Sequence, residues 1–453
     1  MAAAGDSGAG VGAGHREHLR AKCAAALAAL EAFLPPALAV APACLEEGAA
    51  CGGAHADAPE VFVAPRGGRG SRSRCAYALR PAPGGAGAPR PAVEYVHWHE
   101  GVGLVDAEDL DDVQCGAVAA AARRVAAAMP ACAPRLLAHA NAMRFLASTA
   151  TGDVVVRAVL DPKARAAACG EDAVRAMRAE CEALAAAARL RGVLTAGLGE
   201  SGAAGEHLVG HDHVVETYTL ADGRRLSYEH VEGFFSNPSA AACTFTLDWL
   251  CARARELRAR AAERGAQPGA LLELYCGGGN HTVALAPFFS RVTGVELHPR
   301  LVEAAARNVR RNAAANASLG AAATNVEVVA APSAKFCKRV LATKGRCLRK
   351  RAPEGEGEGD ACAEEAYDTL LLDPPRAGLD ALTARMATLF DVVLYVSCSP
   401  AHSLPRDLCV LCKTHEITRM CYIDHFPGSQ HLETALMLER RRGRQVADAD
   451  DVK

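Results

Sequence analysis

Residues 367–400 read YDTLLLDPPRAGLDALTARMATLFDVVLYVSCSP, and this stretch decides the fold. It contains two apolar runs, TLLL and VVLYV, separated by a segment of helical composition. Such runs, bounded by Pro and Gly, are typical of strands inside a parallel sheet. Polar residues follow each run: Asp373 and Arg376 after the first, Cys398 after the second. Because open α/β sheets bind ligands at the carboxyl ends of their strands, we expect a reaction centre here.

The second half of the chain repeats the order strand, turn, helix from Ala270 onward. LLELYCGGGN precedes a helix expected from about His281, RVTGVEL precedes one that runs through Asn312, and NVEVV precedes a basic helix. This alternation predicts a doubly wound parallel sheet of the α/β class. Near the end, ITRMCYIDHFPGSQHLETALMLERR predicts two strands around a Pro-Gly turn. The low-complexity segment 353–365 is expected to be a flexible surface loop.

The first half of the chain mixes strands and helices. Residues 1–14 are rich in Gly and Ala and are expected to be disordered. A helix is predicted from His15, where apolar residues recur at helical spacing. PEVFVAPRGGRGSRSRCAYALR and AVEYVHWHEG predict strands, MRFLASTATGDVVVRAVL predicts a hairpin, and residues 106–128 and 172–189 predict helices. This half is therefore expected to be α+β.

The composition is that of a soluble globular protein. Of 453 residues, 50% are hydrophobic and 23% are charged, and the net charge is −2. No apolar run approaches the roughly 18 residues that a membrane span needs. The amino terminus has no apolar signal-peptide core and is not Arg-rich. We therefore expect an intracellular protein without a membrane partner. The cytoplasm is the expected compartment, and the nucleus and the organelles remain open.

Eighteen cysteines are scattered singly along the chain, which indicates reduced thiols inside the cell. Cys44, Cys51 and Cys75 lack the tight spacing of an iron–sulfur site. Cys409 and Cys412 form a lone CxxC without a second pair of ligands. We expect neither a metal ion nor an iron–sulfur cluster.

Basic residues gather in two segments, 66–90 and 335–351. Such patches bind phosphates even on a protein without net positive charge. Arg72 and Arg74 are the residues expected to contact phosphate groups. The alternative, a solvated basic surface without a ligand, stays open at this point.

The turn in LLELYCGGGN has the composition of a ligand-binding loop, because glycines permit positive φ and a close approach of the backbone. Glu296 follows Tyr275 by 21 residues and ends the next strand, where a carboxylate accepts ribose hydroxyls. The turn lacks the GxGxxG pattern of dinucleotide-binding sites. Glycine turn, acid and DPPR in this order favour S-adenosylmethionine, against the alternative of a structural turn with a surface Glu.

Cys398 and Glu433 form a candidate pair of nucleophile and base. A thiol reacts as the thiolate and therefore needs a nearby cation or a favourable dipole, which Arg376 or the adjacent backbone could supply. Glu433 lies on the hairpin after the Cys398 strand and offers a carboxylate base. A buried thiol without a catalytic role is the alternative.

Five motifs together resemble the tRNA (uracil-5-)-methyltransferase family: LELYCGGGN, DPPRAGLD, YVSCSP, DHFPGSQHLE and GFFSNPSAAAC. The resemblance covers about residues 220–445 and is weaker over 15–160. It implies a Rossmann-like class I methyltransferase domain over 226–443 behind an α+β RNA-recognition domain over 15–225, with a polar tail at 444–453.

The resemblance also implies an activity and its residues. S-adenosylmethionine would methylate carbon 5 of uracil, at the T-loop uridine (position 54) of tRNA. Cys398 would add to carbon 6, and Glu433 would remove the proton from carbon 5. The cofactor-binding residues that it implies are Asn237, Tyr275, Asn280, Glu296 and Asp373. The chain departs from the family pattern at Asn237 (usually Gln), Ser239 (usually Asn) and His281 (usually Phe).

Two other functions remain open. One is a methyltransferase of another class, acting on an exocyclic amine or a protein; Arg376 after Pro-Pro disfavours it, since those enzymes have an aromatic residue there. The other is a non-catalytic tRNA-binding or folding protein on the same scaffold, which would need neither Cys398 nor Glu433. We expect tRNA as the partner and a monomeric protein.

Overall fold

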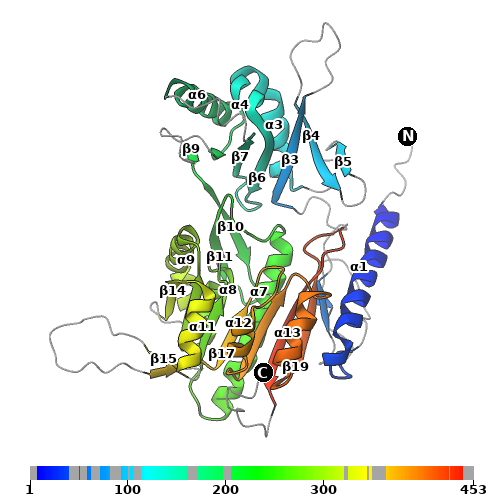
Figure 1. The fold of residues 1–453 in the computed structure, drawn as a ribbon, viewed down its shortest axis with the longest axis vertical. Helices are drawn as coiled ribbons and strands as arrows, with labels where there is room; N and C mark the ends of the chain where they lie inside the picture. Colours follow the sequence, from blue (N-terminus) through cyan, green and yellow to red (C-terminus); the bar gives the residue numbers. More distant parts are fainter. Residues whose placement is uncertain are drawn as a thin grey trace, which may run out of the picture. The chain divides into compact units, whose positions relative to one another are not determined.

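The computed structural model describes residues 8–39, 50–51, 59–62, 72–81, 93–99, 103–106, 114–161, 171–196, 206–320, 325–343, 346–348, 364–427 and 429–441. The chain divides into two compact units (Figure 1). The larger unit comprises Met1–Gly67, Thr219–Leu226 and Ala242–Lys453, and the smaller comprises Gly68–Tyr218 and Ser227–Ala241.

The larger unit is built on a mixed sheet. Within the described ranges its nine strands lie in the order β1 (Ala50–Cys51), β2 (Glu60–Phe62), β19 (His415–Ile423), β20 (Glu433–Arg440), β18 (Val392–Ser397), β17 (Thr369–Leu372), β12 (Ala270–Leu274), β13 (Arg291–Glu296) and β14 (Val326–Ala330). The last five are mutually parallel. Strand β20 runs antiparallel to both β18 and β19. The doubly wound α/β sheet predicted from the alternating pattern is confirmed.

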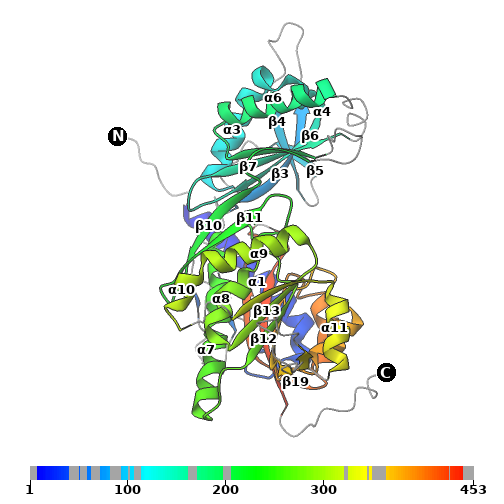
Figure 2. The same cartoon turned by 90° about the vertical axis from the view of Figure 1, so that its left-hand side faces the viewer.

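Helices cover both faces of this sheet (Figures 1 and 2). One face carries α7 (Ala240–Glu263), α8 (Asn280–Leu285), α9 (Pro299–Arg311) and α10 (Ala313–Ala317). The other carries α1 (Gly8–Leu30), α11 (Ser333–Ala342), α12 (Ala381–Ala387) and α13 (Ser403–Leu411). Shorter elements are η1 (Glu31–Phe33), η3 (Ala286–Phe288) and the pair β15 (Arg346–Leu348) and β16 (Glu364–Ala366).

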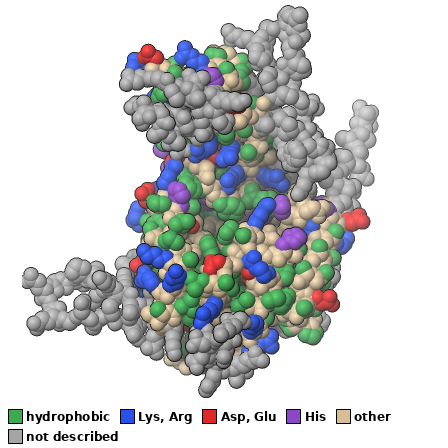
Figure 3. All heavy atoms as spheres, in the orientation of Figure 1, with side chains coloured by type: hydrophobic (Ala, Val, Ile, Leu, Met, Phe, Trp, Pro, Cys, Tyr) green, Lys and Arg blue, Asp and Glu red, His purple; other side chains and the backbone are tan. Residues whose placement is uncertain are grey.

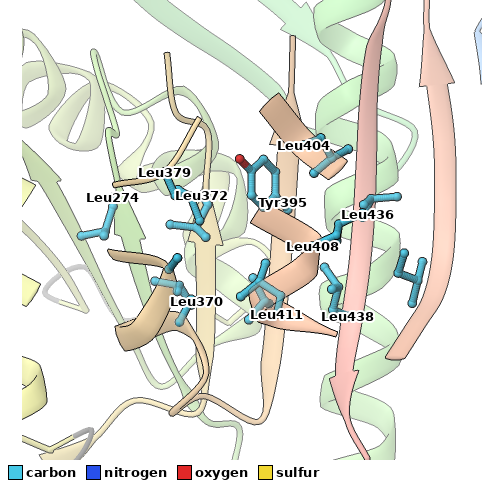
Figure 4. Close-up of a cluster of buried hydrophobic side chains, with 14 of the residues drawn as sticks. Leu274, Leu370, Leu372, Leu379, Tyr395, Leu404, Leu408, Leu411, Leu436 and Leu438 are labelled. Carbon is cyan, nitrogen blue, oxygen red and sulfur yellow. The ribbon is translucent and has the colours of Figure 1, made fainter. Parts of the chain in front are cut away.

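Alternate residues of the central strands form one core with the helices α1, α11, α12 and α13. The members from β12, β17, β18 and β20 with 0% exposure are Leu272, Leu274, Leu370, Leu372, Val393, Tyr395, Leu436 and Leu438. Leu404 and Leu408 of α13 lie over them (Figure 4). The intervening residues, such as Leu371 and Leu394, are equally buried on the opposite face. Burial on both faces explains why these strands read as unbroken apolar runs.

Helix α1 belongs to the larger unit, although the sequence analysis placed residues 15–225 in one amino-terminal domain. Leu19, Cys23 and Leu30 are at most 1% exposed and join the core of the larger sheet. The helix begins at Gly8 rather than His15. Strand β2 also joins this sheet, because it pairs in parallel with β19. An amphipathic pattern shows that a helix has a buried face, but not which sheet it covers.

The smaller unit is an α+β layer pair. Its described strands form a sheet in the order β5 (Gly103–Asp106), β4 (Val93–His99), β3 (Arg74–Pro81), β6 (Ala140–Ala147), β7 (Val154–Leu160), β8 (Gly192–Ala196) and β9 (Glu206–Gly210). Helices α3 (Gly116–Cys132), α4 (Pro134–His139) and α6 (Glu171–Ala187) cover one face (Figure 2). The predicted hairpin of β6 and β7 is confirmed.

A second hairpin, β10 (His213–Thr219) with β11 (Arg225–Val231), has its turn in the larger unit. Arg224 in this turn is 4% exposed and donates to Asp222, to the carbonyl of Ala284 and to Asn316. The turn is thereby fastened to α8 and α10. Nothing in the sequence analysis indicated this hairpin.

Some predictions fall on residues outside those described. These are the tail at 1–7, the insertion at 353–363 and the tail at 444–453, whereas Glu364 and Glu365 belong to β16. Among the described helices, none has the length and apolar character that crossing a membrane requires.

A substitution at Gly294 tests the packing of the glycine turn against β13. A Cβ there would lie 2.9 Å from Oγ1 of Thr282 and 3.0 Å from Sγ of Cys276. Overpacking of this kind destabilises by about 1–3 kcal/mol. We expect Gly294→Ala to lower the free energy of unfolding in urea by that amount. Gly116→Ala is the control, because no atom lies within 4 Å of its added Cβ; an equal loss in both variants would contradict the packing argument.

Candidate active site

The turn after β12 is held in an unusual backbone conformation. Tyr275, Gly277 and Gly279 have φ values of 63°, 55° and 77°. Positive φ is uncommon for a bulky residue and points to a functional constraint. A Cβ on Gly279 would lie 3.2 Å from Cβ of Ala305 in α9, so glycine is needed there for packing. A Cβ on Gly277 would meet nothing within 4 Å, so this part of the turn faces open space.

Glu296, at the end of β13, is fixed beside this turn. Its Oε2 accepts from the backbone N–H of Gly277 at 3.0 Å, and its Oε1 accepts from that of His298 at 2.8 Å. The adjacent Leu297 is 65% exposed. The carboxylate and the apolar side chain together suit a ligand with a hydroxyl-bearing and a flat apolar part. Leu297 was missed in the sequence analysis, because a single Leu after a strand carries no signal.

The strand register brings Asp373, Cys398 and Glu433 to one edge of the sheet. Asp373 follows β17, and Cys398 follows β18, its parallel neighbour. In the antiparallel pair of β18 and β20, Ser397 lies opposite Thr434. Cys398 and Glu433 are the next residues outward on these two strands, and the charge of Glu433 raises the pKa of the Cys398 thiol, so the two groups lie near each other. Glu433 is 6% exposed, whereas Cys398 is half-buried.

Both carboxyl groups are costly to ionise in this position. Burial raises the pKa of Glu433 to about 7, while His281 and Arg376 oppose the rise. Burial also raises the pKa of Asp373 to about 7, with Glu433 adding to the effect and His281 opposing it. A carboxyl group with a pKa near neutrality is suited to take and return a proton.

The surroundings of Cys398 favour the protonated form of its thiol. Burial raises its pKa, and the charges of Glu433 and Asp373 raise it further, while Arg376 lowers it. A cation placed against the sulfur would therefore favour the thiolate. Arg376 is exposed, and its Nη2 lies 3.4 Å from Nε2 of His431.

Two buried histidines flank these acids and were not assigned roles by the sequence analysis. Nδ1 of His281, in α8, lies 3.3 Å from Oε1 of Glu273, and Glu273 raises the pKa of this imidazole against the effect of burial. Nε2 of His425 lies 3.0 Å from Oε2 of Glu433, and burial lowers the pKa of His425 to about 4. One imidazole therefore tends to be cationic and the other neutral. Glu273, a carboxylate inside the apolar run LLEL, was the available signal for the first pair.

The loop that carries Asp373 and Arg376 is anchored from α13. Oδ2 of Asp407 accepts from the backbone N–H of Leu379 at 2.9 Å and from the hydroxyl of Tyr395 at 2.7 Å. Gly378 has a φ of 74°, and a Cβ there would lie 2.5 Å from the same oxygen. The glycine therefore allows the close approach that the buried carboxylate requires.

The remaining predicted site residues are divided between the two units. Asn280, at the start of α8, donates through its amide to Sγ of Cys243 at 3.3 Å. Asn237, Arg72 and Arg74 belong to the smaller unit. The backbone of Arg72 makes isolated bridges to Gln114 and Ser239. Within the described residues, no group of three or more His, Cys, Asp or Glu side chains is arranged to hold a metal ion.

The sequence matches one family model, described as tRNA (Uracil-5-)-methyltransferase, over residues 93–441. A tRNA/tmRNA (uracil-C(5))-methyltransferase of Chromohalobacter salexigens is 33% identical over 373 residues, which cover 78% of this chain and 87% of the relative. A protein of the same name from Neisseria meningitidis serogroup C is 34% identical over 230 residues, 51% of this chain. The chain spans 55%, about half, of the length of that relative.

Among solved structures, the fold is similar to that of a tRNA (uracil-54, C5)-methyltransferase of Pyrococcus abyssi in complex with S-adenosyl-L-homocysteine. The TM-score is 0.52 with 17% sequence identity, and the match covers 82% of this chain and 76% of the other. At this level of identity the likeness concerns the fold.

The raised pKa of Glu433 predicts a pH-dependent effect of removing its charge. Between its ordinary pKa of 4.5 and about 7, the folded protein keeps a proton that the unfolded chain has lost, so this group makes stability fall as pH rises. The free energy of unfolding of Glu433→Gln should therefore exceed that of the wild type at pH 8 by up to about 3 kcal/mol. At pH 5 the difference should be smaller.

Urea unfolding at the two pH values measures this difference. The control is Glu439→Gln, a change on the same strand. The Glu439 carboxylate lies 2.6 Å from Arg260, so its removal should destabilise the protein. If Glu433→Gln destabilises the protein equally at pH 5 and pH 8, Glu433 does not carry the buried charge inferred here.

Proposed function

The chain belongs to the tRNA (uracil-5-)-methyltransferase family, and from this premise we propose that it methylates carbon 5 of uracil in tRNA with S-adenosylmethionine as methyl donor. The observation that carries the proposal is the placement of a thiol and a carboxylate, Cys398 and Glu433, on adjacent strand ends. We take the T-loop uridine at position 54 as the target, in line with the "uracil-54" specificity of the Pyrococcus abyssi protein.

The residues at the carboxyl ends of β12 and β13 fit the methyl donor. Gly277 leaves open space at the turn, and Glu296 is oriented by two backbone N–H groups to accept ribose hydroxyls. Leu297 offers an exposed apolar surface to the adenine ring. Tyr275, Asn280 and Asp373 border the same edge of the sheet, and Asn237 of the smaller unit is the further predicted contact. S-adenosylmethionine supplies an electrophilic methyl group on a positively charged sulfur.

The protein's own residues have to make carbon 5 of uracil nucleophilic. Cys398 adds to carbon 6 as the thiolate, which shifts electron density to carbon 5. The thiol proton must leave first, and it passes to the carboxylate of Asp373, whose charge raises the pKa of this thiol, while Glu433 stays ionised for the later step. Arg376 favours the thiolate in the same step.

Glu433 completes the reaction. After carbon 5 has received the methyl group, its proton passes to the Glu433 carboxylate, and the bond between carbon 6 and the sulfur then breaks. The double bond of the ring is restored and Cys398 is released. Such a base contributes about 10²–10⁴-fold to the rate. The target base has to leave its stack, which costs a few kcal/mol and is cheapest in a loop.

The pairing of Cys398 with Glu433 argues against the two other functions. Exocyclic-amine and protein methyltransferases have no use for a nucleophilic thiol beside a buried carboxylate. A non-catalytic RNA-binding protein has no need to keep two carboxyl groups with pKa values near 7. Among the described residues these features have their simplest use in covalent catalysis.

The arginines of the smaller unit support tRNA binding. Glu232 is 2% exposed, and burial raises its pKa. The charges of Arg157, Arg74 and Arg144 oppose this rise, so one carboxylate interacts with three guanidinium groups. Nε of Arg157 lies 3.4 Å from its Oε1, while Arg144 is exposed. This excess of positive charge suits a phosphate group. In the larger unit, the blue Lys and Arg side chains visible in Figure 3 are interspersed with green and red ones.

Nucleoside analysis by mass spectrometry tests the function directly. Incubation of tRNA with the protein and labelled S-adenosylmethionine should place the label in 5-methyluridine. Cys398→Ala should abolish labelling while tRNA binding is retained, because the nucleophile is lost but the RNA surface is not. Label found only on cytidine, adenosine or protein would contradict the proposal.

Glu433→Gln should separate the two halves of the reaction. The thiol can still add and the methyl group can still be transferred, but the carbon 5 proton is not removed. A covalent adduct of protein and tRNA should accumulate and appear as a shifted band on a denaturing gel, while turnover falls by about 10²–10⁴-fold. Normal turnover without an adduct would show that another group is the base.

Arg74→Ala tests the RNA surface. Removing one phosphate contact should weaken tRNA binding at every salt concentration and reduce the slope of log K against log salt by about one. Arg175→Ala is the matched control, because Arg175 lies on α6 of the same unit with its side chain 77% exposed and 3.9 Å from Asp172. Equal effects of the two changes would point to general charge rather than to a contact by Arg74.

A further inference from the structure

The segment between β19 and β20 leads directly into Glu433 and is held by a helix from the opposite end of the sequence. Asp424 and His425 begin this segment, and Glu433 follows it as the first residue of β20. Lys22 of α1, 402 residues before Asp424, donates to its Oδ1 at 2.7 Å. Both side chains are at most 1% exposed.

All the polar contacts of the Lys22 ammonium group in the described residues go to this one segment. Besides Asp424, Nζ donates to the carbonyl oxygens of His431 at 3.1 Å and Phe426 at 3.4 Å. An ammonium group has three donors, so these contacts use its full capacity. One turn earlier on α1, Nε2 of His18 lies 2.9 Å from the carbonyl oxygen of Ser429. The helix therefore holds the segment at its start, middle and end.

Docking of α1 does not by itself require this buried charge. Leu19, Cys23, Ala26 and Leu30 already pack into the core of the larger sheet. A buried ion pair is often no more stabilising than apolar side chains of the same volume, whereas it fixes the geometry of the groups that it joins. The contacts of Lys22 restrict the chain at Asp424, Phe426 and His431. An apolar side chain at position 22 would not restrict it.

The restricted segment reaches Glu433 by two routes. His431 lies two residues before Glu433 along the chain. His425, adjacent to Asp424, has 0% exposure, and its Nε2 lies 3.0 Å from Oε2 of Glu433 and 3.5 Å from Oγ1 of Thr246 in α7. Its Nδ1 is buried without a hydrogen-bond partner among the described residues. Protonation at Nε2 therefore suits this ring, and that proton faces the carboxylate of Glu433.

We propose that Lys22 is a positioning residue for Glu433: it fixes residues 424–427 and 429–432 so that His425 holds one oxygen of the Glu433 carboxylate and leaves the other for the proton of carbon 5. The catalytic part of this inference rests on the proposed function. The part that concerns the support of the segment rests on the contacts of Lys22 alone. Helix α1 is then a component of the active site although none of its residues touches substrate.

The test compares Lys22→Met with Arg20→Met, the same change at an exposed position of the same helix. Displacement of a catalytic group by about 1 Å costs on the order of 10²-fold in rate. Lys22→Met should lower kcat by about 10- to 100-fold with the KM values for tRNA and S-adenosylmethionine unchanged, and the covalent tRNA adduct should accumulate. Arg20→Met should behave as the wild type. Normal turnover in Lys22→Met, or the same defect in Arg20→Met, overturns the proposal.

A second variant covers the case in which Lys22→Met does not fold, because it leaves Asp424 charged and buried. Lys22→Met combined with Asp424→Asn removes both charges with little change of volume. This double variant should fold, as judged by a cooperative thermal transition, and should still accumulate the adduct. If the double variant folds and turns over as the wild type does, the segment does not need the contacts of Lys22, and the proposal is overturned.

Hydrogen–deuterium exchange separates this inference from the proposed function. Peptides covering 424–433 should exchange faster in the double variant than in Arg20→Met, while peptides of β18 should not change. Unchanged exchange over 424–433 overturns the inference whatever the protein methylates. If exchange over 424–433 becomes faster but the wild-type protein makes no 5-methyluridine, the support of this segment by Lys22 is upheld. Only the proposed function is then refuted.

Discussion

The antiparallel register between β18 and β20 is the constraint on which the site depends. Five parallel strands bring Tyr275, Glu296, Asp373 and Cys398 to one edge, as any doubly wound sheet would. Glu433 reaches that edge only because β20 runs antiparallel to β18 and pairs Thr434 with Ser397. A slip of one residue would turn Glu433 to the opposite face of the sheet, away from the thiol of Cys398.

The buried position of Glu433 makes ionisation of its carboxyl group unfavourable in the folded protein. Burial raises the pKa values of Glu433 and Asp373 to about 7, which means that the folded state resists their ionisation. The surroundings offset part of this penalty, chiefly through His281, which Glu273 holds on α8. The site thus stores strain in its electrostatics as well as in the positive φ of Tyr275.

The sequence was most informative where a strand ends in a polar residue. Apolar runs followed by DPPR and SCSP predicted the edge, its parallel order and three of its side chains, because burial on both faces leaves a readable pattern. The pattern reports burial and not partners, so the neighbours of Glu433 were missed. His425 and Lys22 contact it or its segment through pairings across the fold, and Lys22 lies in a helix that had been assigned to the other domain.

The assignment of α1 to the larger unit changes what the amino-terminal residues are for. A helix that only covered the sheet edge would need its apolar side chains and nothing more, since Leu19 and Leu30 are completely buried. Lys22 instead carries a charge into that interface and uses its donors on the segment before Glu433. Because an unpaired buried charge is strongly destabilising, the contact of Lys22 with Asp424 favours the ordered state of both the helix and the segment. The position of the segment before Glu433 is therefore tied to the docking of a helix whose Lys22 lies 402 residues before Asp424 in the sequence.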